Sequence, residues 1–390
     1  MAERVDALAN PVLLSWARRT AGFDLGAAAK KIPVSRERLE SWENGEAHPT
    51  IKQLGKLANA YKRPIAVFYL PEPPRDFQAL RDFRRLPDRI LPPQSPALLF
   101  SIRRARDRRE LAIDLLEASG DEPPPFGFAV TLEEDPEDVA KRIREFLGIR
   151  LEDQVRWKPD YDTFNHWRAA LESAGVFVFQ AAGVDVKEIR GFSIYSDVLP
   201  AAVVNMKDSI RGRSFTLLHE FTHIALNQAG ICDLTEARPQ TDEQLVEVFC
   251  NQVAGATLLP REALLAEPLV SRNQDPSRWQ DADIRALSDR YGVSREVVLR
   301  RLLITGRATN TLYEQKREEL LREYAEMEER GRKGFAPPHR VAIVSAGPTF
   351  VKLVLDSYRQ DTITAGDVAD FLGVRLKHIG RIESEVAGFA

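Results

Sequence analysis

The chain has 390 residues, a formal net charge of -3, 44% hydrophobic residues and 29% charged residues. This composition is typical of a globular protein with more than one domain, and it excludes a chain-long basic coat for nucleic acid. No stretch approaches the roughly 18 uninterrupted apolar residues of a membrane span, and the N-terminal segment lacks the apolar core of a signal peptide. We therefore expect a cytoplasmic protein with no membrane partner.

The first seventy residues predict a compact bundle of short helices. Eleven Lys/Arg against seven Asp/Glu give residues 1–70 a net charge of +4. Asp24, Ser35 and Thr50 each precede a helical pattern, as N-caps do, and Asn44 with Gly45 ends the third helix. The helices are expected over 11–22, 24–32, 34–45, 50–61 and 64–70.

A spaced pattern within this segment resembles the helix-turn-helix domain of the XRE (lambda-repressor-like) family. The matching positions are Ala28, Ala29, Val34, Ser35, Leu39, Trp42, Glu43, Gly45, Pro49 and Thr50. In such a domain the third helix enters the major groove of DNA. The resemblance therefore implies that residues 1–70 bind operator DNA.

Candidate DNA contacts lie at the start and on one face of the third helix. They are Ser35, Arg36, Arg38 and Ser41. The alternative is a protein-docking module in which the two arginines form a solvated face, because the basic excess is small and a fold does not fix a function.

A connector and a charged helix follow over 71–127. Seven prolines between 71 and 96 predict an extended, semi-rigid spacer. A helix is expected over 96–120, ended by Gly120, with the basic run from Arg103 to Arg109 on an exposed face.

The pattern changes to mixed helix and strand over 128–275. Amphipathic helices are expected near 132–149 and 162–175, and strands at 176–180, 191–197 and 200–206. The spacing of the strands suggests a small antiparallel sheet, which leads into a helix capped by Ser214. The strand at 200–206 is a candidate for pairing with an added β-strand from another chain.

That helix carries the sequence HEFTH, an H-E-x-x-H motif. His219 and His223 are four residues apart and share one helix face, so both imidazoles can reach a single Zn²⁺ ion. Glu220 projects beside them, where it can exchange a proton as general base. Apolar neighbours nearly all round the helix predict burial, and buried polar groups are costly unless something pairs with them.

The third ligand is expected from an acid farther along the chain. Between Gln244 and Pro260, Glu247 is the only ionisable acid in an otherwise uncharged helix. A carboxylate in that setting is costly unless it is paired or bound to a metal. We therefore expect a His219, His223 and Glu247 ligand set.

This stretch resembles the ImmA/IrrE family of metallo-endopeptidases. The matching positions are His219, Glu220, His223, Glu247, Cys250, Asn251, Val253, Ala254, Leu258 and Pro260. Thr222 and Val253 stand where many members have Gly and Phe. The resemblance implies zinc as cofactor, Glu220 as the catalytic base and Asn251 just outside the ligand set. It also implies cleavage of a partner protein, typically a helix-turn-helix repressor, which switches on stress or mobile-element genes.

Two later segments have sequence patterns similar to that of the first domain. The sequence VSRE at 34–37 recurs at 293–296, within a second helix, turn and helix pattern. A third pattern lies at 363–383, where packing of an ordinary helical hairpin is the favoured interpretation. A long charged helix is expected between these two segments, where it would be exposed to solvent and connect them.

The expected fold is multidomain and mainly α, with an α+β zincin-like peptidase core and an all-α helix-turn-helix domain in front. The leading hypothesis for function is a zinc endopeptidase of narrow specificity. The alternative is an XRE-type regulator or antitoxin-like protein, with a possible toxin partner and a structural or inactive zinc site. The expected segments are 1–70, 71–127, 128–275, 276–330 and 331–390.

Overall fold

The fold is that of a computed structural model, which describes residues 5–74, 81–82, 94–158, 160–227, 230–232, 242–329 and 336–386. The chain divides into two compact units. The first spans residues 1–79 and 90–104, and the second spans 80–89 and 105–390. Most of the proline-rich connector lies outside the described residues, so its extended conformation stays a prediction.

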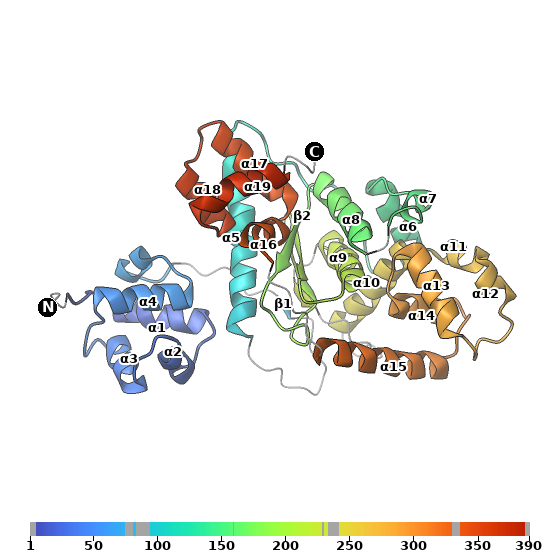
Figure 1. Cartoon of the computed structure of the whole chain (residues 1–390), viewed down its shortest axis with the longest axis horizontal. Helices are drawn as coiled ribbons and strands as arrows, with labels where there is room; N and C mark the ends of the chain where they lie inside the picture. The colour runs from blue at the N-terminus through green and yellow to red at the C-terminus, as the bar shows by residue number, and fades with distance from the viewer. Residues whose placement is uncertain are drawn as a thin grey trace. The chain divides into compact units, whose positions relative to one another are not determined.

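The first unit is a helical bundle (Figure 1). Its elements are α1 (Pro11–Thr20), α2 (Leu25–Lys31), α3 (Arg36–Glu43), α4 (Ile51–Tyr61) and the 3-10 helix η1 (Ile65–Tyr69). The side chains of Asp24, Ser35 and Thr50 accept hydrogen bonds from the backbone of the helices that they precede, as expected from the sequence. Trp42 and Tyr61 are fully buried in the core of the bundle.

Helix α5 (Pro96–Ala118) runs from the first unit into the second. The expected exposed basic face holds only at Arg104, because the other four arginines of the run are half-buried or buried. Arg108 is buried and donates to the Ser345 carbonyl at 2.8 Å. Arg109 is half-buried and donates to the Leu199 carbonyl at 2.9 Å. Composition shows the charge of such a run but not which carbonyl groups the fold brings beside it.

The second unit is built around a five-stranded sheet in the order β1-β5-β3-β4-β2. The expected strands appear as β2 (Phe177–Ala181), β3 (Gly191–Ile194) and β4 (Ala201–Asn205). Two short strands, β1 (Arg81–Asp82) and β5 (Gly230–Cys232), extend the sheet on the side of β3.

The sheet is mixed, which corrects the expectation of an antiparallel one. Strand β3 pairs antiparallel with β4 and β5, but β2 pairs parallel with β4, and β1 pairs parallel with β5. Consecutive strands often pair directly. Here the connection 182–190 carries the chain past the position that β4 later takes, between β2 and β3.

Helices surround this sheet. Helix α9 (Ile210–Ala225) packs against β3 and β4 and also against α10 (Asp242–Leu258) (Figure 1). The remaining helices up to residue 329 are α6 (Pro136–Phe146), α7 (Leu151–Gln154), α8 (Tyr161–Ser173), α11 (Arg261–Ala266), α12 (Pro268–Arg272), α13 (Asp281–Tyr291), α14 (Arg295–Ile304) and α15 (Asn310–Glu329).

The chain ends in a helical module, residues 336–386, which we call the C-terminal module. It contains α16 (Pro338–Ala346), α17 (Pro348–Arg359), α18 (Ala365–Leu372), the 3-10 helix η2 (Leu376–His378) and α19 (Ile379–Val386). Phe350 of α17 makes edge-on contacts with Phe177 and Phe179 of β2. These contacts attach the module to the sheet.

No single helix among the described residues combines the length and the apolar composition that crossing a membrane requires. Helices α16 and α17 meet that criterion only as a pair, across a bend of 107°. The expected fold class, multidomain and mainly α with a small α+β core, is confirmed. The five segment boundaries stay predictions.

Candidate metal centre

Helix α9 presents the H-E-x-x-H residues inside the core. Its N-cap is Ser209, whose side chain accepts from the Gly212 backbone nitrogen. The expected cap, Ser214, is wrong, because it lies in the second turn with its hydroxyl directed at the Ile210 carbonyl. Every residue from Gly212 to Ala225 is buried, as the apolar sequence around the motif predicts.

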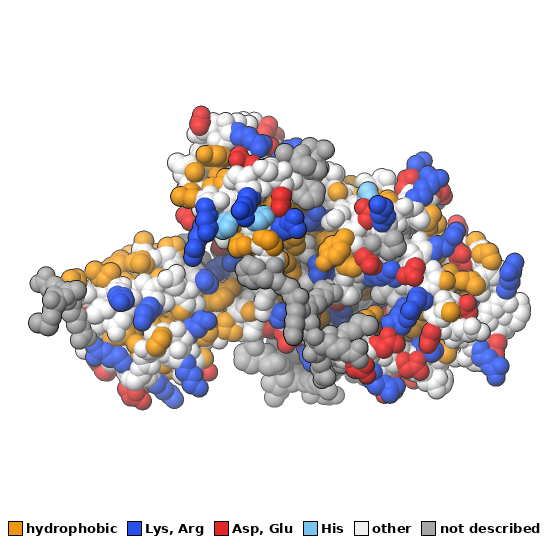
Figure 2. All heavy atoms as spheres, viewed as in Figure 1, with side chains coloured by type: hydrophobic (Ala, Val, Ile, Leu, Met, Phe, Trp, Pro, Cys, Tyr) orange, Lys and Arg blue, Asp and Glu red, His pale blue; other side chains and the backbone are white. Residues whose placement is uncertain are grey.

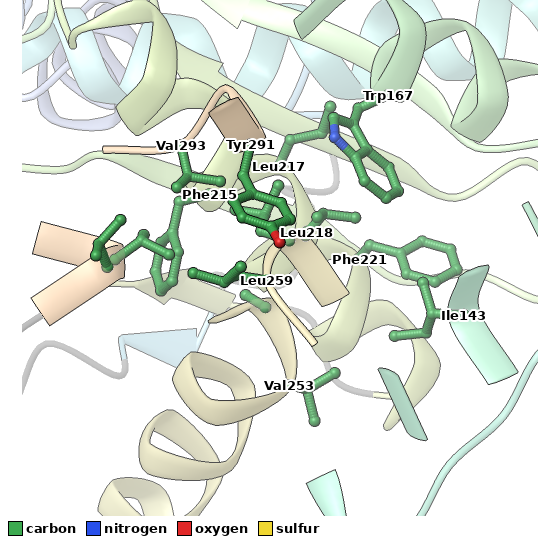
Figure 3. Packing of buried hydrophobic residues seen from close by; sticks show 14 of the residues in the cluster. Ile143, Trp167, Phe215, Leu217, Leu218, Phe221, Val253, Leu259, Tyr291 and Val293 are labelled. Carbon is green, nitrogen blue, oxygen red and sulfur yellow. The ribbon is translucent and has the colours of Figure 1, made fainter. Parts of the chain in front are cut away.

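Aromatic and aliphatic side chains hold this helix in place. Phe215, Leu217, Leu218 and Phe221 of α9 pack among side chains from other helices, including Ile143 of α6, Trp167 of α8 and Val253 of α10 (Figure 3). The Phe221 ring stacks on Phe128 with 5.6 Å between centroids. Close packing of this kind fixes the rotation of α9 and therefore the direction of its histidines.

Three side chains converge from α9 and α10. His219 Nε2 and His223 Nε2 are 3.1 Å apart. Glu247 places Oε2 at 3.3 Å from His219 Nε2 and Oε1 at 3.2 Å from His223 Nε2. Donor atoms bound to one zinc ion at about 2.0–2.2 Å in a tetrahedron lie roughly 3.3 Å apart. The spacing of these three residues therefore fits one zinc ion.

The electrostatics of the cluster fit a cation as well. Burial lowers the pKa of His219, which favours the neutral imidazole. Burial alone would raise the pKa of Glu247, but the neighbouring His223 and His219 outweigh it and lower the pKa to about 2. Neutral imidazoles and a carboxylate are the protonation states that bind metal.

Asn251 lies one turn after Glu247 on α10 and is buried. The nearby Asn251 side chain raises the pKa of His219 and so partly offsets the effect of burial, although neither amide atom of Asn251 has a hydrogen-bond partner among the described residues. This places Asn251 beside the three candidate ligands, where a side chain can orient an imidazole.

Glu220 is fully buried beside the candidate ligands and comes against strand β3. A Cβ atom added to Gly191 would lie 2.8 Å from Glu220 Oε1 and 2.6 Å from Thr216 Cγ2. Gly191 thus leaves the room that the Glu220 carboxylate occupies. Nothing in the local sequence marks this role, because a glycine at the start of a strand has many uses.

The expected docking strand for substrate is wrong. β4, which corresponds to the segment 200–206, lies inside the sheet and is hydrogen bonded to β2 on one side and to β3 on the other. It has no free backbone edge to offer a peptide. Pairing partners of this kind come from distant segments, so the sequence of the strand alone does not indicate them.

Two polar residues that precede the motif in the sequence, Tyr195 and His166, have partners of their own. Tyr195 donates to Asp197 Oδ1 at 2.5 Å. His166 stacks on Trp157, with 4.4 Å between ring centroids, and lies 3.7 Å from Asp162. Neither is among the side chains that converge with Glu247.

The candidate DNA contacts lie in the first unit as expected, but they differ in availability. Arg36 and Arg38 are exposed. Ser35 is also exposed, although its hydroxyl caps α3 by accepting from the Arg38 backbone nitrogen. Ser41 is half-buried and donates to the Arg38 carbonyl. The two arginines are therefore the freer candidates for contact with a ligand.

Comparisons with known families agree with both parts of this description. Residues 173–303 match a peptidase family described as an IrrE N-terminal-like domain. Residues 14–68 match a helix-turn-helix family. Comparison with curated protein sequences gave no match. The matched segment 173–303 contains α9 and α10, and 14–68 contains α2 and α3.

Proposed function

Because the chain carries an IrrE N-terminal-like peptidase domain and a helix-turn-helix domain, we propose that it is a zinc-dependent endopeptidase of narrow specificity. The observation that carries the proposal is the convergence of His219, His223 and Glu247, with Glu220 buried beside them as a fourth polar group. Three protein ligands with one open position are typical of catalytic zinc sites.

Each residue has a defined task in this proposal. His219, His223 and Glu247 hold the ion, which supplies Lewis acidity toward the peptide carbonyl. Glu220 takes a proton from the attacking water on its carboxylate and passes it to the nitrogen of the leaving amine. Gly191 leaves space for that carboxylate, and Asn251 lies close enough to His219 to influence its pKa.

We further propose that the substrate is a transcriptional repressor that has its own helix-turn-helix domain. Cleavage would inactivate the repressor and switch on stress or mobile-element genes. The domain at 14–68 supports this proposal, since a helix-turn-helix domain can bind operator DNA, which is where such a repressor is bound.

The test measures zinc content and proteolysis on the same preparations. The wild-type protein is expected to hold about one zinc ion per chain, as three ligands for one ion require. His219→Ala and Glu247→Ala are expected to lose the zinc. Glu220→Gln is expected to retain it and to stop cleavage of the repressors encoded beside the gene. Glu262→Gln, at an exposed position on α11, is the control and is expected to change neither property.

One observation favours a second candidate. His219, Glu220 and His223 have 0% exposed surface, as in a structural metal site. The chain would then be an XRE-type regulator or antitoxin-like protein whose zinc only stabilises the fold. Full zinc content together with unchanged function in Glu220→Gln would favour this candidate, and full zinc in Glu247→Ala would remove the proposed ligand set.

A further inference from the structure

A segment of the C-terminal module repeats the register of the N-terminal helix-turn-helix. Residues 24–43 and 364–383 align without a gap, each position being 340 residues farther along (364 - 24 = 340). Asp24 and Thr364 each cap the first helix through their side chains. Pro33 and Gly373, at equivalent positions of the turn, both have a positive φ, of 29° and 66°.

The buried positions of the two segments also coincide. Five pairs are buried in both: Ala28 and Val368, Ala29 and Ala369, Ile32 and Leu372, Leu39 and Ile379, and Trp42 and Ile382. The second helix is α3 in the first segment and η2 followed directly by α19 in the other. The C-terminal segment therefore shares the register, the turn and the buried positions of the N-terminal helix-turn-helix, which favours a helix-turn-helix over an ordinary helical hairpin.

The helix, turn and helix around residues 293–296, which we call the middle repeat, differs from the other two in the residues that its second helix exposes. It has the same turn, with Gly292 at φ 65° and Ser294 as N-cap. However, its second helix α14 buries every residue from Val297 to Leu302. The middle repeat is thus part of the peptidase core. The second helix of the C-terminal repeat instead exposes Arg375, Leu376, Lys377, Gly380 and Arg381.

The exposed face of the C-terminal repeat is positively charged. Residues 375–383 contain three Lys/Arg and one acid, a net charge of +2. The equivalent residues 35–43 contain two Lys/Arg and three acids, a net charge of -1. Within the described part of the chain, no carboxylate forms an ion pair with Arg375, Lys377 or Arg381. The nearby Glu385 is engaged with His339 and Arg340, both at 3.1 Å.

Other basic groups border these three side chains. Figure 2 shows His side chains with Lys and Arg around them on the C-terminal module. The rings of His339 and His378 lie 6.2 Å apart. Partial burial and the positive charge of Lys377, His339 and Arg381 lower the pKa of His378. The lowered pKa of His378 thus reflects the excess of positive charge close to η2 and α19.

We propose that residues 364–386 form a second helix-turn-helix that binds double-stranded DNA, with η2 and α19 in the major groove. Arg375, Lys377 and Arg381 would contact phosphates or guanine edges. Leu376, which is 59% exposed, would meet an apolar base edge such as a thymine methyl. A protein-docking surface would have an apolar and aromatic centre, and Leu376 is the one apolar member of this face.

Gly380 strengthens the assignment, because it lies in the middle of the basic face. Its position in α19 has no heavy atom within 4 Å of an added Cβ, so the fold does not require glycine there. Glycine lowers helix stability relative to other residues. A bare backbone at this point lets a groove come close to the helix.

The first test uses the full chain and a labelled DNA duplex of mixed sequence, titrated at several salt concentrations. All proteins carry Arg36→Ala and Arg38→Ala, which remove two candidate DNA contacts of the N-terminal helix-turn-helix. The triple variant Arg375→Ala, Lys377→Ala, Arg381→Ala is expected to bind more weakly. In a plot of log affinity against log salt, the slope of the triple variant is expected to be shallower by about 2 to 3. Each lost phosphate contact reduces the magnitude of this slope by roughly 0.9.

The matched control removes the same charge elsewhere. Arg272→Ala, Arg285→Ala and Lys352→Ala change three exposed cations outside the proposed face, and this variant is expected to keep the affinity and slope of the parent. Equal affinity and slope in the two triple variants would overturn the proposal. So would the absence of DNA binding by the parent at low salt, which is the outcome expected if the face binds a protein.

A second test changes the face without removing any contact within the fold. Gly380→Glu places a negative charge opposite the phosphates and is expected to weaken DNA binding at least tenfold. Gly380→Lys has a similar size and is expected to bind at least as tightly as the parent. Both should show the same thermal unfolding, because the added side chain points into open space. The same affinity in both variants would contradict the proposed docking of α19.

Discussion

Gly191 affects the candidate centre because its lack of a side chain leaves room for the Glu220 carboxylate. A methyl group at this position would lie 2.6 Å from Thr216 Cγ2 and 2.8 Å from both Glu220 Oε1 and the Val203 carbonyl oxygen. Carbon and oxygen atoms do not approach so closely without displacement. Either the Glu220 carboxylate or strand β3 has to move.

We predict that Gly191→Ala stops proteolysis but leaves zinc bound. The expected loss of stability is about 1–3 kcal/mol, the usual cost of adding a methyl group to a packed core. Zinc content, thermal unfolding and cleavage are measured together. Gly183→Ala is the control for stability, because an added Cβ there has no neighbour within 4 Å, although its positive φ adds some strain. Full activity in Gly191→Ala would show that Glu220 does not need its present position.

Residue-scale patterns were predicted well where the cause is local. Four-residue spacing is enough to place His219 and His223 on one helix face, and a lone acid in an apolar helix is enough to single out Glu247. The structure brings these three together, while their roles stay predictions. Gly191 was not found from sequence, because its effect comes from a neighbour 29 positions away (220 - 191 = 29).

At the scale of elements, a buried carboxyl group lies where α8 meets the start of α17. Glu172 Oε2 accepts from the Thr349 hydroxyl at 2.7 Å. Burial raises the pKa of Glu172 to about 7, although Arg168 and Thr349 act in the opposite direction. The protonated form is thus favoured in the folded chain, at the attachment of the C-terminal module.

This raised pKa predicts how stability depends on pH. The pKa of Glu172 is about 7 in the folded chain, against an ordinary value of 4.5 for a glutamate side chain. The folded state therefore binds more protons, and its stability falls as pH rises from about 4.5 to about 7. The upper limit of the loss is on the order of 3 kcal/mol.

Glu172→Gln is expected to remove this dependence. The variant should be more stable than the wild type at pH 8 and differ less from it at pH 5, as measured by urea unfolding at both values. The exposed Glu152→Gln serves as the control for a general change in charge. A stability difference that is the same at both pH values would contradict the raised pKa.

Elements were predicted more reliably than their arrangement. Helix starts at Asp24, Ser35 and Thr50 follow from side-chain capping, which depends on only three or four residues. The expectation that Ser214 caps α9 failed because the helix begins earlier, after Ser209, which is also a serine preceding a helical pattern. The parallel pairing of β2 with β4 could not be predicted, since it depends on a connection that carries no pairing information of its own.

The whole molecule consists of two units with separate cores. The candidate metal ligands all belong to the second unit. A ligand that binds only the folded state stabilises it by an amount that grows with the ratio of ligand concentration to its dissociation constant. Zinc is therefore expected to stabilise one unit and not the other.

Calorimetry of the full chain tests this expectation. Two transitions should be resolved, and chelation of zinc should lower the melting temperature of the larger one only. At a thousandfold excess over the dissociation constant the stabilisation is about 4 kcal/mol. Zinc added back should restore the transition, and His219→Ala should not respond to either treatment. A shift of both transitions would show that the units do not unfold independently.

The complete burial of His219, Glu220 and His223 also affects the rate at which a substrate can reach them. In a peptidase built this way, a peptide reaches the reacting groups only after local opening of the core around α9. Under the proposed function, the observed turnover would then include the free energy of that opening in addition to the barrier to bond cleavage. Slight warming or a little urea is expected to speed the enzyme, until the same treatments unfold it.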